Sequence, residues 1–248
     1  MRNRWKLAFV IGTFLAGSAA TGRADVEQEN RPRKLKDVGE VSFVDTSGNT
    51  AATTFNLKND LSYTFHTKTK LDWTGGVLYA KSGSVASAEQ YQTSLRADQA
   101  LTDRFFAFAL AGWQRDRFAG IGQRYNEGAG AGLQVFKTVR NDLRSDAGFN
   151  YIVEERTTGE IKRSPAALTD INYRFNFTQQ TSFGWDGKGD FDLNDTANYQ
   201  LESLLSLQTS LTKMLAWKNS YLVRYKHEPV PGFGSTDRTF STAMVVNF

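Results

Sequence analysis

Histidine is scarce in this sequence, which restricts the catalytic arrangements that the chain can hold. The chain contains two histidines, His66 and His227, and no cysteine. A serine hydrolase needs a histidine within hydrogen-bond reach of its nucleophile. Ser220 precedes His227 on the same expected strand, and at the usual rise of a strand the two would be about 23 Å apart. A serine on another strand stays open as an alternative, but we predict histidines at strand ends and no enzyme.

An acidic run suggests a second kind of hydrolytic site. Proteolysis by carboxylates and a histidine would combine His227 with acidic residues of the segment Asp-Gly-Lys-Gly-Asp-Phe-Asp-Leu-Asn-Asp. The candidates are Asp186, Asp190, Asp192 and Asp195. The composition of the segment is typical of a solvated loop, so we predict a loop over 186–196.

Part of this segment resembles a calcium-binding loop, but incompletely. Asp190, Asp192 and Asn194 have the spacing of positions one, three and five of such a loop. Asp195 stands where the loop requires glycine, and the twelfth position is Leu201 instead of glutamate. We therefore predict no dedicated metal site or cofactor, and only loose bridging of divalent ions to lipopolysaccharide.

A larger set of charged residues is spread along the chain in a regular way. Each member alternates with apolar residues, so on a strand all of them would project from the face opposite the apolar one. Both signs are present in near balance. The set comprises Lys58, Asp60, Arg96, Asp98, Arg124, Arg144, Asp146, Asp170, Arg174, Glu202, Arg224 and Lys226.

The elements that must position these residues are strands, because hydropathy alternates along the chain with a period of two. Over 51–66 the odd positions are largely apolar, with an aromatic end, and the even positions are polar. Strands of soluble proteins usually stop near six residues, whereas this run has about 15, as a tilted membrane strand with some overhang would. Its length therefore favours a membrane strand.

The alternation recurs and predicts twelve strands, the first over 39–47 and the last ending at Phe248. The run at 105–113 has apolar residues on both parities, so its orientation stays open. Gly48-Asn49 is typical of a tight hairpin. The remaining connections alternate between a short set, at 66–69, 102–103, 138–141, 179–181 and 212–215, and a mostly longer set, at 82–88, 117–122, 156–164, 186–196 and 228–235.

An even strand number and alternating loop lengths are typical of a bacterial barrel with both ends in the periplasm. We therefore predict an all-β fold, a transmembrane antiparallel up-and-down β-barrel of about twelve strands over 38–248. Its lumen would be lined by the twelve charged residues. They would either pair across strands and fill the lumen or line a narrow aqueous path. Glycines at 128, 130 and 132 would either hollow one wall or permit a tight bend.

The N-terminal segment has the features of a secretory signal. A positive start precedes an apolar core of about ten residues and then small residues, so we expect a signal peptide over 1–24 and a short periplasmic tail over 25–37. The signal holds four of the 30 Lys and Arg residues and none of the 26 Asp and Glu residues. The remaining chain is thus neutral, which argues against nucleic acid as a partner.

The chain ends on Phe248 with apolar residues at every second position before it. Barrel-assembly machinery recognises this kind of C-terminal strand, and we predict Phe248 as the assembly signal. A soluble protein whose last strand happens to end in phenylalanine is the alternative.

Three motifs resemble the YdiY-like family of putative salt-induced outer-membrane proteins. They are Val41-Ser42-Phe43 with Ser47-Gly48-Asn49-Thr50, Gly128-Ala129-Gly130-Ala131-Gly132 and Val245-Val246-Asn247-Phe248. The resemblance covers nearly all of the chain after the signal. It implies an outer-membrane barrel without assigned chemistry, so it identifies no functional residue.

Together these observations predict a Gram-negative outer-membrane protein that acts as a narrow passive channel or an envelope-stress structural component. An outer-membrane hydrolase of phospholipase or protease type and a purely structural or surface-interaction barrel are the alternatives. The expected partners are outer-membrane lipid and lipopolysaccharide, together with the barrel-assembly machinery and periplasmic chaperones.

Overall fold

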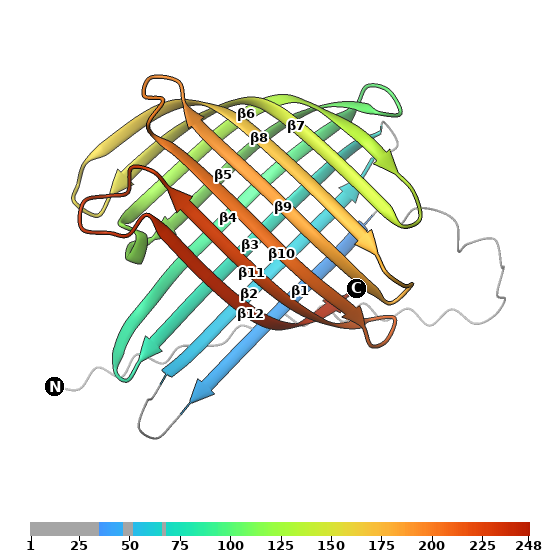
Figure 1. Cartoon of the computed structure of the whole chain (residues 1–248), viewed down its shortest axis with the longest axis horizontal. Coiled ribbons are helices and arrows are strands. Elements are labelled where there is room, and N and C mark those ends of the chain that lie inside the picture. The colour runs from blue at the N-terminus through green and yellow to red at the C-terminus, as the bar shows by residue number, and fades with distance from the viewer. Residues whose placement is uncertain (1–34, 47–51, 66–67) are drawn as a thin grey trace. The chain divides into compact units, whose positions relative to one another are not determined.

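The computed structural model describes residues 35–46, 52–65 and 68–248, and these residues form a closed antiparallel β-barrel (Figure 1). Each strand pairs with its neighbours in sequence, and β12 pairs with β1, which confirms the predicted twelve-stranded fold. Among the described residues, no helix is long and apolar enough to cross a membrane. The elements are β1 (Leu35–Thr46), β2 (Ala52–Thr64), β3 (Thr69–Ser82), β4 (Val85–Ala100), β5 (Phe105–Asp116), the short 3-10 helix η2 (Arg117–Ala119), β6 (Ile121–Lys137), β7 (Asn141–Arg156), β8 (Ile161–Asn176), β9 (Thr181–Asp192), β10 (Tyr199–Ser210), β11 (Leu215–Lys226) and β12 (Thr236–Asn247).

The two ends of the barrel differ in their connections. We term the end at which β1 begins and β12 ends the terminal end, and the opposite one the loop end. The terminal end carries, among others, the short connections 101–104, 138–140, 177–180 and 211–214. The loop end carries 83–84, 117–120, 157–160, 193–198 and 227–235, of which the last is the longest of those described.

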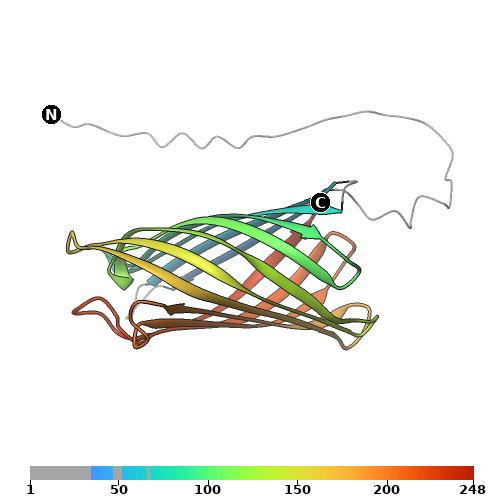
Figure 2. The ribbon, with the colours of Figure 1, turned by 90° about the horizontal axis from the view of Figure 1, so that it is seen from above.

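The barrel closes where its last strand meets its first. Val38 lies opposite Asn247 and Val41 lies opposite Met244. Figure 2 shows the two ends of the colour scale, blue β1 and red β12, in one continuous wall. The paired segment of β1 thus reaches Val41, whereas Phe43 lies beyond the residues that pair with β12.

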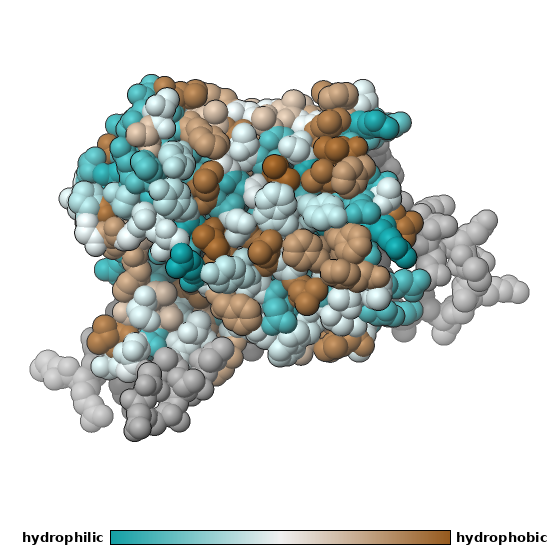
Figure 3. Space-filling view, in the orientation of Figure 1, coloured by the Kyte–Doolittle hydropathy of each residue, from teal (hydrophilic) through white to brown (hydrophobic). Residues whose placement is uncertain are grey.

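The outer wall of the barrel is apolar, as the alternation predicted. Leu57 of β2 and Leu205 of β10 have 40% of their surface exposed, although both lie in the middle of long strands. Figure 3 shows hydrophobic residues, in brown, spread across the visible wall among paler and teal ones. Because water would disfavour so much exposed apolar surface on a soluble protein, this wall matches the lipid-facing surface of a membrane barrel.

The structure settles the orientation of β5, which the sequence left open. Phe106 and Phe108 point into the barrel, where 8% and 4% of their surface is exposed. Phe105 has the opposite parity and is 55% exposed on the outer wall. This strand therefore brings large apolar rings into a lumen that is otherwise polar.

The predicted loop at 186–196 is wrong, because β9 continues through Asp192 and only 193–198 connect it to β10. Asp186 pairs with Asn172 of β8 on one side and with Leu204 of β10 on the other. The glycines that suggested a loop lie beside aromatic rings: a Cβ added to Gly189 would be 2.8 Å from the ring of Phe191. Neighbours on both sides and covering rings thus hold a glycine-rich strand in place.

Other loops at this end are also shorter than predicted. The connection expected at 82–88 spans 83–84, and the one expected at 156–164 spans 157–160. Strands continue past the last apolar residue because the backbone ladder needs hydrogen-bond partners and not apolar side chains. Pro165 lies within β8 and directly precedes Ala166, which is the first residue of β8 that pairs with β9. Its missing N–H therefore breaks no bond there.

Residues 35–37, expected in the N-terminal tail, belong to β1. The predicted signal peptide over 1–24, the rest of the tail, the hairpin at Gly48-Asn49 and His66 lie outside the described residues.

Neighbouring positions on β10 test which face meets lipid. We expect Leu205→Arg to destabilise the folded barrel by about 2–4 kcal/mol, because it places a charge on the lipid face near mid-membrane. Gln208→Arg, on the inner parity, should be nearly neutral. The heat-modifiable folded band on gels, followed through a urea series in detergent or lipid, measures both. Equal losses in the two variants would contradict this register.

Candidate functional site, a polar chamber inside the barrel

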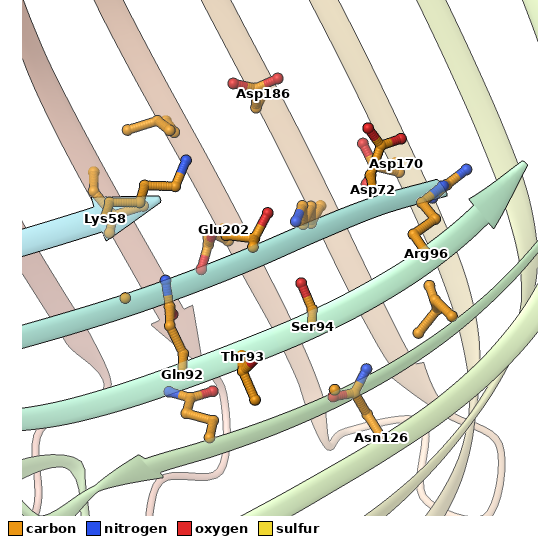
Figure 4. Close-up of a pocket in the computed structure, with 18 of the residues that line it drawn as sticks. Lys58, Asp72, Gln92, Thr93, Ser94, Arg96, Asn126, Asp170, Asp186 and Glu202 are labelled. Carbon is orange, nitrogen blue, oxygen red and sulfur yellow. The ribbon is translucent and has the colours of Figure 1, made fainter. Parts of the chain in front are cut away.

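The lumen contains a chamber of about 620 Å³ that is lined by residues from all twelve strands. Figure 4 shows carboxylate, guanidinium and amide groups pointing into it from facing walls. A cavity of this size and polarity holds water or a small solute. Eight of the twelve charged residues singled out in the sequence line it, namely Lys58, Arg96, Asp98, Arg124, Arg144, Asp170, Glu202 and Arg224.

The other four members of that set lie near the chamber or at its ends. Asp60 pairs with Lys58 at 2.9 Å. Asp146 is buried beside the chamber, and Lys226 pairs with Glu154 near the loop end. Arg174 is exposed near the terminal end of β8.

Sequence reasoning missed several charged residues of the chamber. They are Glu40, Lys70, Asp72, Asp186, Lys188, Asp190 and Lys218. Glu40 and Lys218 share the parity of their inward neighbours, so extending the alternation would have found them. The three residues of β9 were missed because their strand was interpreted as a loop.

A closed ring of charges fills one side of the lumen near the terminal end. Arg96 binds Asp98 at 2.9 Å and Asp146 at 2.8 Å. Arg144 binds the second oxygen of Asp98 at 2.8 Å and lies 3.8 Å from Asp146. These four residues form what we term the Arg–Asp ring. Since the side chain of Asp146 is only 1% exposed, loss of either arginine would leave a carboxylate that water cannot reach.

The Arg–Asp ring rests on the two inward phenylalanines. The guanidinium carbon of Arg144 is 3.7 Å from the centre of the Phe106 ring, and that of Arg96 is 4.0 Å from the centre of the Phe108 ring. Cations over aromatic faces are attracted by the ring quadrupole, and more strongly where water is excluded. Leu168 completes the apolar base.

The inward glycines of β6 make room for these rings. A Cβ at position 132 would overlap the ring of Phe106, and one at position 130 would be 2.8 Å from the ring of Phe108. A Cβ at Gly130 would also be 2.6 Å from the Cα of Gly148 on β7. The glycines thus hollow the wall, as one interpretation held, but Phe106 and Phe108 fill the hollow. The tight approach of β6 and β7 agrees with the other interpretation.

Near the loop end, hydrogen bonds cross the lumen between distant strands. Lys226 of β11 binds both carboxylate oxygens of Glu154 on β7 at 2.9 Å. The Arg224 guanidinium donates to the side-chain oxygen of Gln90 on β4 at 3.1 Å. β4 and β11 lie almost opposite each other in the barrel. These contacts bound the chamber on the side of the loop end.

One loop crosses the mouth beyond these contacts. The 227–235 connection follows β11, whereas η2 follows β5. These two strands lie on opposite sides of the barrel, six strands apart. Nevertheless, a Cβ at Gly120 would be 2.8 Å from the Cβ of Val230 and 2.9 Å from the ring of Phe233, and Val230 is 1% exposed. Figures 1 and 2 both show this red connection beside the green η2. We term residues 227–235 the crossing loop.

The hydrolytic candidates do not assemble. Ser220 is buried inside the barrel, where its hydroxyl is 3.1 Å from that of Ser241. His227 has the opposite parity, stacks on Tyr199 at 4.9 Å between ring centres and shares a hydrogen bond of 2.9 Å with the Tyr225 hydroxyl. The serine and the histidine therefore project from opposite faces of the wall.

The acidic run is also divided between different places. Asp190 accepts a hydrogen bond from Asn150 inside the chamber at 2.9 Å. Asp192 instead accepts hydrogen bonds from Asn198 and from the backbone of Asn194, which orders the 193–198 connection. In the part of the chain that the structure describes, no group of three or more Asp, Glu, His and Cys residues is arranged to hold a metal ion.

The sequence matches a known family over almost the whole barrel. A family model described as "Protein of unknown function, DUF481" matches residues 39–248. The chain is also 25% identical over 187 residues to the uncharacterized protein YdiY of Escherichia coli (strain K12), across 75% of this chain and 72% of that protein.

Solved structures share the fold at low sequence identity. The NanC porin has a TM-score of 0.52 and 13% identity, with 85% of this chain and 98% of that chain covered. The COG4313 outer membrane channel from Pseudomonas putida F1 has a TM-score of 0.55 and 9% identity, with 92% and 100% covered. The likeness places this chain among barrels of the outer-membrane type.

The packing of Phe106 on β6 is tested by adding a single methyl group. We expect Gly132→Ala to destabilise the barrel by about 1–3 kcal/mol. The added Cβ would overlap the phenyl ring of Phe106, which Arg144 of the Arg–Asp ring holds in place. Gly39→Ala is the control, since a Cβ there would meet nothing within 4 Å. Urea unfolding of the refolded protein measures both. Adding Phe106→Leu should recover part of the loss in Gly132→Ala, whereas purely additive effects would contradict this contact.

Proposed function

The chain belongs to the DUF481 family of proteins of unknown function, and we propose that it is a narrow passive channel for small polar solutes in the outer membrane. The observation that carries this proposal is the polar chamber of about 620 Å³ inside a barrel with an apolar outer wall. A structural barrel would be expected to fill its interior with mutually paired side chains, whereas here charged and amide groups line an open space.

The boundaries of the chamber set the size of what would pass. The Arg–Asp ring narrows the terminal end, and the bonds from Lys226 and Arg224 narrow the loop end. The crossing loop adds a third restriction. Such a path suits solutes of a few heavy atoms and excludes folded or polymeric ones.

A structural barrel is the second candidate, since ion pairs fill part of the lumen. It differs from the channel in a measurable way, because it would conduct no ions. A hydrolase has less support: Ser220 and His227 lie on opposite faces, and the acidic residues near His227 are divided between chamber and loop.

The proposed location and assembly route follow from the two ends of the barrel. We propose that a signal peptide over 1–24 directs export, that the terminal end faces the periplasm and that the loop end contacts lipopolysaccharide. Phe248 is 64% exposed at the terminal end, and its N–H donates to the carbonyl oxygen of Asp37 at 3.0 Å. An exposed terminal aromatic on the last strand is available to the assembly machinery and its chaperones.

Conductance in planar bilayers tests the channel. We expect small, stable single-channel currents from the purified full-length barrel in KCl. Val230→Asp should enlarge them, because a charge is costly in the buried contact that holds the crossing loop over the mouth. Val139→Asp is the matched control, since Val139 is 91% exposed in the 138–140 connection. A silent membrane with correctly folded protein would favour the structural barrel.

The role of the terminal aromatic is tested separately by cell fractionation. We expect deletion of Phe248 to cause periplasmic accumulation and proteolysis, because it removes the proposed assembly signal and a hydrogen bond at the closure. Asn247→Ser changes the neighbouring side chain but leaves that signal, and should assemble normally. Efficient membrane insertion of the deletion variant would show that recognition depends on other residues.

A further inference from the structure

The charges of the chamber are not balanced once their ion pairs are assigned. Its basic side chains are, with one exception, each bonded to a carboxylate: for example, Lys218 binds Glu40 at 2.5 Å and Arg224 binds Glu202 at 2.9 Å. The exception among the described residues is Lys188 of β9. Paired groups attract a passing ion weakly, so the unpaired groups decide which sign the chamber favours.

Three carboxylates on one wall have amide partners instead of cations. Asn172 donates to both Asp170 and Asp186, at 2.9 and 3.0 Å. Asn150 donates to Asp190 at 2.9 Å. An amide satisfies a lone pair but leaves the negative charge in place. We term Asp170, Asp186 and Asp190 the acidic wall; Figure 4 labels the first two among the residues that line the chamber.

Among the residues directly opposite the acidic wall across the sheet there is one cation. Asp190 lies between Leu168 and Gln200 across the sheet, and both are uncharged. Asp170 faces a further carboxylate, Asp146, on β7 and faces Lys188 on β9. Like charges directly opposite each other on a sheet repel. Lys188 also lies opposite Glu202 of β10. It is thus the one unpaired cation available to the three carboxylates, and the wall keeps an excess of negative charge.

Unpartnered oxygen atoms lie beside the same wall. The side-chain oxygen of Asn150 has no hydrogen-bond partner, although this residue is only 3% exposed and lines the chamber. It faces Gly128, where a Cβ would be 3.1 Å away, so the missing side chain leaves space in front of it. One carboxylate oxygen of Asp146 is likewise buried without a partner. Because no donor compensates these buried oxygens, they add to the negative potential at this wall.

From these observations we propose that the chamber selects small monovalent cations, such as alkali ions and small ammonium compounds, along the acidic wall. This inference rests on the proposed channel and specifies its substrate class. Anions are disfavoured because the arginines of the chamber are already bound: Arg96 and Arg144 in the Arg–Asp ring, Arg224 to Glu202 and Arg124 to Glu154 at 4.0 Å. Divalent metals are disfavoured because the carboxylates are spread along two strands and do not converge on one point.

Reversal potentials across planar bilayers in a KCl gradient test the proposal with the full-length barrel. We expect roughly twofold or greater preference for potassium over chloride. The double variant Asp186→Asn with Asp190→Asn should lose most of this preference, whereas Lys188→Gln should increase it. Asp103→Asn makes the same chemical change in the exposed 101–104 connection and should leave selectivity unchanged.

The outcomes separate this inference from the proposed function. Conductance without cation preference, or preference that the wall variants leave unaltered, would overturn the inference and leave the channel standing. Absence of conductance in folded protein would overturn both. The aspartate variants and Lys188→Gln should shift the potassium-to-chloride preference in opposite directions. General destabilisation of the barrel would not produce opposite shifts, because all three substitutions lie on β9 and differ only in the sign of the charge that they remove.

Discussion

The structure depends on satisfying every backbone hydrogen bond of a sheet that faces lipid. An open sheet has two edges whose N–H and C=O groups lack partners, and in hydrocarbon each of them would cost several kcal/mol. Pairing of β1 with β12, from Val38 opposite Asn247 to Val41 opposite Met244, removes both edges. Long strands, a strict alternation of side chains and the position of the last residue all follow from this closure.

Closure creates a second problem, because a ring of this many strands leaves an interior that side chains only partly fill. The two parts of the lumen are filled to different degrees. Near the terminal end, inward glycines on β6 bring two phenylalanines and the Arg–Asp ring into close contact. Elsewhere the lumen keeps the chamber. The glycines and the rings depend on each other: without the rings a void would remain, and without the glycines the rings would not fit.

The same asymmetry supports a channel more than a filled structural barrel. Charges that serve stability are mutually bonded, as Arg96, Asp98, Arg144 and Asp146 are. Those of the acidic wall are held by amides, which leaves their charge available to a solute. The crossing loop, anchored by Val230 against Gly120 and by the ion pair of Glu228 with Lys162 at 3.7 Å, restricts entry at the opposite end.

The sequence alone determined the class of fold and much of the lumen. Alternation along a strand determines which side chains point inward, and it identified Lys58, Asp98, Glu202 and five other lining charges without knowledge of their neighbours. It failed on β9, where Gly187 and Gly189 suggested a loop, because strand pairing on both sides outweighs local propensity. Only the tertiary structure decided that Phe106 points inward, that Arg96 binds Asp146 rather than solvent and that the acidic wall has more carboxylates than cations. Each of these depends on which strands are neighbours and how far their side chains reach across the lumen, and a periodic pattern carries no information about distances between strands far apart in the chain.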